Sequence, residues 1–222
     1  GTLQRIEIGV NSPTRNLPRK GPPIPDDGLS VNIVASGVAV RPVDGMPVVH
    51  DADLKARVTG RTATVSIGQG IADTPAGRKV TISDFVFEVP DMAPKPSPSR
   101  TRFRVDGPVP AAAEMLANDR LSDLSATVVD PNTSKGTFSA NIQLGLPVKG
   151  ELTKADTTYA VTADLNGFAA DKLVMNQKLE ANNLKISASN QGYQVKGDVK
   201  INGQAASLDY RKPAEGAADV KL

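Results

Sequence analysis

The stretch Gly136-Thr-Phe-Ser-Ala-Asn-Ile-Gln-Leu-Gly-Leu-Pro-Val148 decides the fold class. Apolar side chains occupy every second position from Phe138 to Val148, and polar side chains fill the positions between them up to Gln143. Successive side chains of a β-strand point to opposite faces of the sheet. The alternation therefore predicts a strand with one apolar face and one polar face.

The same alternation returns toward the C-terminus. It occupies four further segments, at residues 159–165, 184–188, 193–201 and 206–210. Asn202-Gly203 separates the last two segments, and both residues tolerate the positive φ that a two-residue type I′ turn requires. Residues 136–210 therefore predict an antiparallel meander with a single apolar face.

The N-terminal half follows the same rule with more interruptions. Strands are expected within residues 3–10, 29–40, 48–58, 63–67, 80–89, 101–105 and 126–128. The phase of the alternation shifts at Ser36-Gly37 and again before Phe85, and such shifts indicate β-bulges. Residues 11–28 and 90–99 are proline-rich connectors, because proline cannot donate to a strand ladder.

One short helix is expected at residues 110–118, where a proline opens the first turn. About a dozen strands and one helix predict an all-β fold, which we treat as a single β-rich unit over residues 1–222. No segment has the ~18–20 consecutive apolar residues that cross a bilayer. We expect the chain to be an internal piece of a longer protein, with the targeting segment outside it.

Composition excludes several function classes. The 26 basic and 24 acidic residues give a net charge of +2, which argues against a nucleic-acid partner. The chain contains no cysteine, so a disulfide framework and a cysteine metal site are excluded. We predict no cofactor.

No residue pattern indicates an enzyme. His50 is the only histidine, and the alternation places it in the apolar phase of a strand, without a nucleophile-elbow pattern nearby. Asp51 and Asp53 share the polar phase, but a divalent cation needs further oxygen ligands that the sequence does not supply. A structural role for His50 and a solvated role for the two carboxylates are therefore predicted, and we predict that the protein is not an enzyme.

Arg100, Arg102 and Arg104 form a cationic row on one strand face. Guanidinium groups suit phosphate geometry, so the row is a candidate contact for lipid head groups or for an acidic partner. The alternative is an exposed face whose charge prevents edge pairing.

The apolar face as a whole demands a partner. Open sheets beyond ~10 strands curl or split into packed layers. The sheet could close on itself as a sandwich or barrel, or it could curl into a trough whose inner wall receives an apolar ligand. Periodicity alone does not distinguish these two arrangements.

Three stretches carry a family resemblance. They are Asp106-Gly107-Pro108 followed by residues 111–116 and Leu121, the stretch from Gly136 to Val148 with its Leu-Pro ending, and the Lys-Gly and Asn-Gly hairpin from Tyr193 to Tyr210. With these stretches the chain resembles the AsmA-like superfamily of Gram-negative envelope proteins, which includes AsmA, TamB and YhdP. Over residues 29–210 it is most similar to the middle region of YhdP-type proteins of alphaproteobacteria.

The resemblance implies a long antiparallel meander curled into a trough (a taco-like sheet) with a hydrophobic concave face. It also implies a periplasmic protein, anchored in the inner membrane by a segment outside this chain, with neighbouring β segments of the same full-length chain as partners. Family members are thought to carry phospholipids or other lipids between the inner and outer membranes, and the family supplies no catalytic residues. The alternative is a ligand-free structural or protein-interaction β domain.

The residues expected to line the lipid groove hold the apolar phase of their strands. They are Val48, Ala52, Leu54, Val58, Phe138, Ile142, Leu144, Leu146, Tyr159, Val161, Leu165, Leu184, Ile186, Val195, Val199, Ile201 and Leu208.

Overall fold

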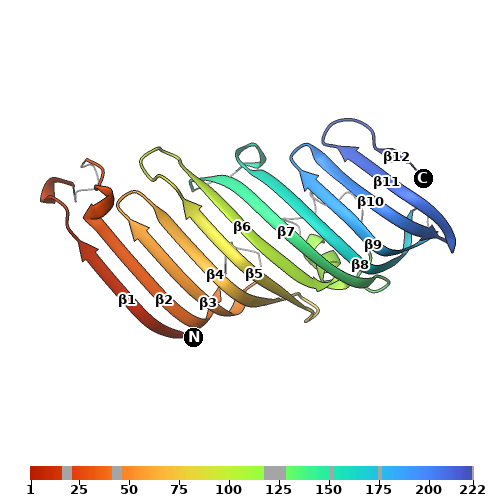
Figure 1. Ribbon diagram of the computed structural model, residues 1–222, viewed down its shortest axis with the longest axis horizontal. Helices are drawn as coiled ribbons and strands as arrows, with labels where there is room; N and C mark the ends of the chain where they lie inside the picture. Colours follow the sequence, from red (N-terminus) through yellow and green to blue (C-terminus); the bar gives the residue numbers. More distant parts are fainter. Residues whose placement is uncertain (17–21, 42–46, 118–128, 151–152, 175–176, 222) are drawn as a thin grey trace.

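Within the described residues, the fold is one open antiparallel sheet of twelve strands, in which each strand pairs with the next along the chain (Figure 1). The computed structural model describes residues 1–16, 22–41, 47–117, 129–150, 153–174 and 177–221. Strands β1 and β12 form the two edges of the sheet. The predicted all-β meander, curled into a trough with one short helix, is confirmed.

The strands and the helix have the following bounds: β1 (Thr2–Val10), β2 (Leu29–Val40), β3 (Val49–Thr59), β4 (Ala63–Asp73), β5 (Lys79–Val89), β6 (Ser97–Pro108), α1 (Val109–Leu116), β7 (Lys135–Val148), β8 (Thr158–Val174), β9 (Gln177–Ser189), β10 (Gly192–Ile201), β11 (Gln204–Pro213) and β12 (Asp219–Lys221). Short 3₁₀ turns lie at Thr14–Asn16, Asp26–Gly28 and Lys154–Asp156. The connections β1–β2, β3–β4, β5–β6, β7–β8, β9–β10 and β11–β12 share the edge that is uppermost in Figure 1, which we call the upper rim. The opposite edge is the lower rim.

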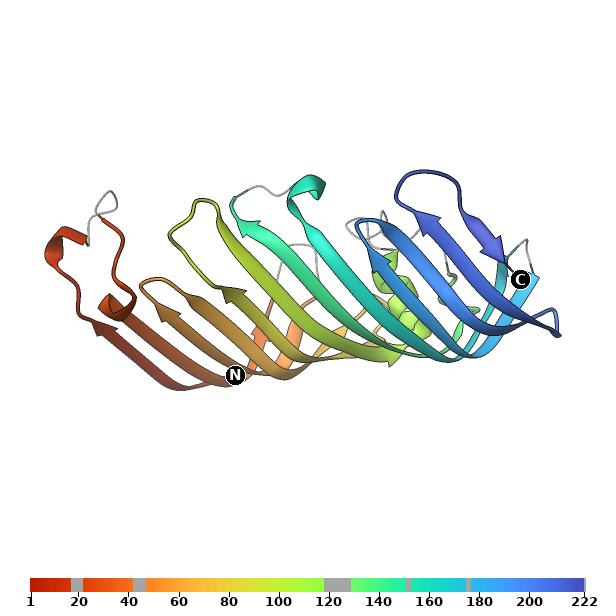
Figure 2. The same ribbon diagram turned by 45° about the horizontal axis from the view of Figure 1, so that its top comes forward.

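The sheet curls because its strands are bulged. Gly37, Asp51, Asp84 and Gly167 lie inside β2, β3, β5 and β8 with φ of 57°, 55°, 53° and 58°. A residue in this left-handed region interrupts the ladder, bends its strand and increases the local twist. Repeated across the sheet, the bends produce the trough seen in Figure 2. The phase shifts predicted at 36–37 and before Phe85 are confirmed as register shifts.

The hairpin predicted at Asn202-Gly203 is also confirmed. Both residues have positive φ, of 48° and 85°, and the flanking Ile201 and Gln204 pair directly. This is the backbone geometry of a type I′ turn, whose twist matches the twist of the two strands.

Helix α1 lies inside the trough (Figure 2) and covers the part of the sheet nearest the lower rim. Ala111 has no exposed surface and packs among residues of β3, β5 and β7, while Val109 packs against β8 and β9. An ion pair from Arg78 in the β4–β5 turn to Glu114 fixes the helix to the lower rim. The helix begins one residue before the predicted start, and residue 118 lies outside the described residues.

The predicted phase of β3 is wrong at its beginning. The strand starts at Val49, which is 4% exposed and pairs with Ala72 in the core, whereas Val48 precedes the strand. The bulge at Asp51 shifts the alternation by one residue, so Val49 takes the core position expected for Val48. For the same reason His50 lies on the face opposite the core.

Other boundaries shift for local reasons. The connector predicted at 90–99 ends earlier, because β6 begins at Ser97 and buries Ser97 and Ser99. The Ser99 hydroxyl donates a hydrogen bond of 2.7 Å to the Leu146 carbonyl of β7, which satisfies its buried polar atom. The strand predicted at 126–128 and the family position Leu121 lie outside the described residues, and the short β12 was not predicted.

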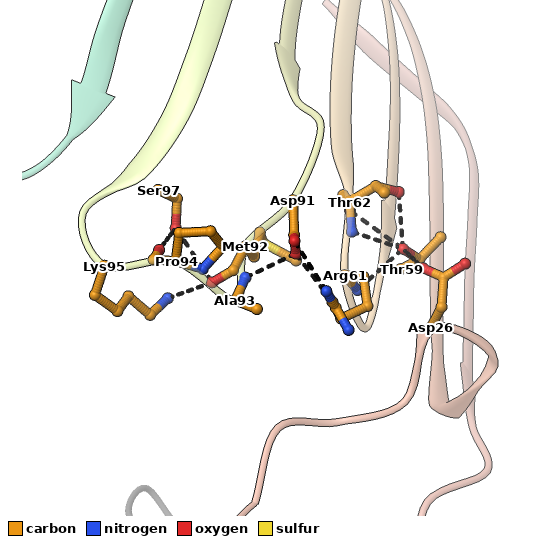
Figure 3. A network of polar contacts seen from close by, with 10 residues as sticks. All are labelled: Asp26, Thr59, Arg61, Thr62, Asp91, Met92, Ala93, Pro94, Lys95 and Ser97. Carbon is orange, nitrogen blue, oxygen red and sulfur yellow. Dashed lines mark hydrogen bonds and ion pairs between the residues drawn. The ribbon is translucent and has the colours of Figure 1, made fainter.

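A polar network joins three connections of the upper rim (Figure 3). The Arg61 guanidinium donates two hydrogen bonds of 2.9 Å to the Asp91 carboxylate, which also accepts one from the Ala93 N–H. The Arg61 hydrogen bonds, helped by the Ala93 N–H, lower the pKa of Asp91 below its usual value. The Thr59 hydroxyl donates to the Asp26 carboxylate of the first connector. The β1–β2, β3–β4 and β5–β6 connections are thereby tied together.

Candidate functional site: the concave apolar face

Cross-strand pairing places the predicted groove residues on one face of the sheet. Ile142 of β7 pairs with Val161 of β8, and Val161 pairs in turn with Ala188 of β9. The same face includes all the groove residues except Val48, namely Ala52, Leu54, Val58, Phe138, Ile142, Leu144, Leu146, Tyr159, Val161, Leu165, Leu184, Ile186, Val195, Val199, Ile201 and Leu208. Because α1 packs on it inside the curl, this is the concave face.

The face is closed near the lower rim. Ala52, Val80 and Ala111 form part of one buried cluster around the helix. Phe168 and Leu184 belong to a second cluster, formed mainly by β8 to β11. These side chains are at most 4% exposed, so this half of the trough is an ordinary packed core.

The face is open toward the upper rim and toward β1. Ile142, Leu144 and Val161 are only half-buried, although they share the face of the packed core. On β1 the apolar residues are mainly exposed: Leu3 59%, Ile6 52%, Ile8 66% and Val10 59%. Exposed apolar surface of this kind makes the open part of the face a candidate binding surface.

Sequence reasoning missed much of the aromatic lining. All eight aromatic residues of the chain lie on the concave face: Phe85, Phe87, Phe103, Phe138, Phe168, Tyr159, Tyr193 and Tyr210. The rings of Phe85 and Phe103 lie 5.9 Å apart in a tilted contact. The alternation within residues 80–89 and 101–105 contained the signal for Phe85, Phe87 and Phe103.

The arginine row lies on the convex face. Arg100, Arg102 and Arg104 are exposed and alternate with Thr101 and Phe103, which face the trough. The structure therefore does not bring the row together with the predicted groove residues. Contact of the row with lipid head groups or with an acidic partner stays a prediction.

The row is also partly neutralised. Arg104 donates hydrogen bonds of 2.8 and 2.9 Å to Asp106 on the same strand. The interaction lowers the pKa of Asp106 and raises that of Arg104. Arg100 pairs in register with Glu88 of β5.

His50 bridges two carboxylates near the lower rim. Its Nδ1 lies 2.8 Å from Asp51 Oδ2, and its Nε2 lies 2.8 Å from Asp73 Oδ2. These hydrogen bonds raise the pKa of His50 above 6.5, and the bond to Asp51 contributes most. Asp53 instead accepts a long hydrogen bond from the Gly37 N–H, so Asp51 and Asp53 do not converge on a common ion.

Other site types find no match in the part of the chain that the structure describes. No group of three or more His, Cys, Asp or Glu residues there is arranged to hold a metal ion. No helix there has both the length and the apolarity to cross a bilayer. A hollow of about 670 Å³ is lined by residues of β9 to β11, but its lining includes the charged residues Glu180, Asp198 and Lys200. The concave face is therefore the better candidate for an apolar ligand.

Comparison with known protein families, with curated proteins and with solved structures gave no match. The candidate site therefore depends on the geometry of the face itself.

Proposed function

We propose that this chain is a lipid-binding segment of a bridge-like transporter, with acyl chains lying along the concave face. The proposal rests on the difference in size between the sheet and α1, the helix that packs on its concave face. Helix α1 has eight residues and is about 12 Å long. Twelve strands at a spacing of ~4.8 Å make a sheet roughly 50 Å wide. Among the residues that the structure describes, α1 is thus too short to cover most of the upper half of the face.

The chemistry of the face favours an acyl chain. The backbone N–H and C=O groups of the inner strands are engaged in the ladder, so a ligand on this face finds few hydrogen-bond partners. An irregular peptide segment would bury unsatisfied backbone groups there. An acyl chain has none, and each buried methylene contributes ~0.8 kcal/mol.

The resemblance to AsmA-like envelope proteins supports the same proposal. It adds a location in the periplasm, an inner-membrane anchor outside this chain, and phospholipids or related lipids moving between the two membranes. Neighbouring β segments of the full-length chain would extend the trough at the edge strands. The proposal includes no catalytic step, no cofactor and no nucleic acid.

A ligand-free structural or protein-interaction domain is the rival. It is favoured by α1 itself, because this helix shows that an amphipathic helix fits the concave face. A partner protein could then supply a second helix to the open half. This rival expects the purified chain to contain no lipid.

Site-specific photocrosslinking separates the two functions. A photoreactive side chain at Leu144 would face the trough, and one at the neighbouring Gln143 would face the convex side. Expression in a Gram-negative host followed by irradiation and mass spectrometry should give a lipid adduct at 144 and none at 143. A protein adduct at 144, or lipid at both positions alike, would refute the proposal.

A further inference from the structure

The concave face carries almost no charge. Among the strand residues whose side chains the structure describes, Lys212 of β11 is the one charged residue in the concave phase. The phase follows from its pairing, because Lys212 lies directly opposite Tyr193, and Tyr210, two residues away on the same strand, lies opposite Val195. Lys212 is half-buried at the upper rim. A cation on an otherwise apolar face calls for an anionic partner.

Two phenol groups lie beside this lysine. The rings of Tyr193 and Tyr210 are 5.6 Å apart, and their hydroxyl oxygens are 3.4 Å apart. The hydrogen bond from Tyr193 and partial burial raise the pKa of Tyr210 above its usual value. The chain's third tyrosine, Tyr159, lines the same half of the trough on β8. The phenylalanine pair of β5 and β6 lies farther along the trough and offers no polar tip.

Lys212 keeps donor capacity for a ligand. Its ammonium donates one hydrogen bond of 2.6 Å, to the Gly216 carbonyl, and an ammonium has three donors. No ion pair joins Lys212 to a carboxylate in the described ranges, and the neighbouring Asp209 is engaged by Arg211 and Lys196. The structure thus presents one cation and two hydroxyls at the end of an apolar trough.

We propose that Lys212, Tyr193 and Tyr210 form the seat of an anionic lipid head group, a carboxylate or a phosphate, with the acyl tail running toward β7 and β6. This inference rests on the proposed lipid-binding function and deepens it by fixing the head-group class and the orientation. The tail would pass Ala188, Val161 and Ile142, which follow Tyr193 in a continuous series of cross-strand pairs from β10 to β7.

The tyrosines themselves provide the measurement. The chain has three tyrosines and no tryptophan, so its intrinsic emission arises only from this half of the trough. Bromine quenches by contact, so a fatty acid brominated beside the carboxylate reports on the head, and one brominated at the tail end reports on the tail. We expect stronger quenching at saturation from bromine near the carboxylate. Equal quenching, or stronger quenching by tail bromine, would overturn the orientation.

The charge is tested with a fatty acid and its methyl ester, which have the same tail. Wild type should bind the acid more tightly than the ester. Lys212→Met should weaken the binding of the acid by roughly five- to tenfold and leave the binding of the ester unchanged, as expected for one charge-assisted contact. Lys212→Arg should keep most of the preference. Lys185→Met is the matched control, because Lys185 is exposed on the convex face of β9.

The outcomes separate the inference from the function beneath it. If acid and ester bind equally and Lys212→Met changes neither affinity, the trough binds lipid but the head-group seat is wrong. If neither probe binds, the proposed function fails with it. If inorganic phosphate alone binds as tightly as the fatty acid, the site is an anion site without a lipid tail, and the inference is refuted. Loss of acid binding in Tyr193→Phe or Tyr210→Phe, with ester binding intact, supports it.

Discussion

A carboxylate placed in the open half of the trough should be tolerated by the fold but not by a lipid. Val161 is half-buried on the concave face, where Ile142 and Ala188 are its cross-strand neighbours. In Val161→Asp the new carboxylate can stay hydrated, because the upper half of the trough is open. The loss is then about half of a valine's burial, ~1 kcal/mol, plus up to ~1 kcal/mol of strand preference.

The same change in the closed half should be far more costly. Leu184 is 2% exposed and packs in the buried cluster of β8 to β11. Leu184→Asp leaves a cavity and a buried carboxylate, which together cost more than ~5 kcal/mol. That is comparable with the ~5–15 kcal/mol total stability of a typical domain. The variant should not fold.

Thermal unfolding by circular dichroism distinguishes the two halves. For a chain of this size ~2 kcal/mol corresponds to a fall in Tm of roughly 4–8 °C, which is the result expected for Val161→Asp. Thr162→Asp is the matched control on the convex face and should remain within ~1 kcal/mol of wild type. Lipid extracted from the same preparations should be lost in Val161→Asp and retained in Thr162→Asp. If Val161→Asp unfolds as completely as Leu184→Asp, the upper half is a closed core and the open-trough interpretation is refuted.

Three further variants test the frame of the trough. Gly136→Ala should lower the free energy of unfolding by about 1–3 kcal/mol in chemical denaturation, because φ of Gly136 is 107° and a Cβ there would lie 2.6 Å from a backbone oxygen of β8. Gly68→Ala is the control and should be much milder, because a Cβ at Gly68 meets no atom within 4 Å. Equal losses of stability in the two variants would contradict this account. His50→Gln should lower Tm relative to wild type at pH 5.5, and this difference in Tm should shrink as the pH rises through the raised pKa of His50. The reason is that the bridge to Asp51 and Asp73 stabilises the fold only while the imidazole is protonated. A difference in Tm that does not depend on pH would refute the bridge. Arg78→Met should destabilise the fold more than the double variant Arg78→Met/Glu114→Gln, since the single change leaves the mostly buried Glu114 carboxylate without its cation. Additive losses of stability in a double-mutant cycle would show that the two side chains do not interact.

Local sequence signals determined the strand faces and several turns. The strict alternation in residues 138–148 and 193–201 was sufficient, because the two-residue period of a strand leaves only one way to gather the apolar side chains. Asn202-Gly203 fixed its hairpin through backbone preference alone. The phase shifts at 36–37 and before Phe85 located two bulges for the same reason.

Where the local pattern was ambiguous, prediction failed. At the start of β3 the sequence shows two adjacent valines, Val48 and Val49, and either could have been the inward residue. The choice depends on the bulge at Asp51, where the pairing of β3 with β2 shifts register, and on the hydrogen bond between His50 and the distant Asp73. The burial of Ser99 likewise depends on the β7 backbone, which supplies the acceptor for its hydroxyl.

The sequence by itself determined an antiparallel meander with one apolar face, because alternation and turn residues act over a few neighbouring positions. Only the tertiary structure decided that the sheet curls into an open trough, because curvature accumulates from bulges on many strands. It also decided which half of the face α1 closes, because Ala111 of the helix joins a buried cluster with residues far away in sequence such as Ala52. The alternation in residues 100–105 already placed the arginine row on the face opposite Phe103, and only the tertiary structure decided that this face is the convex one.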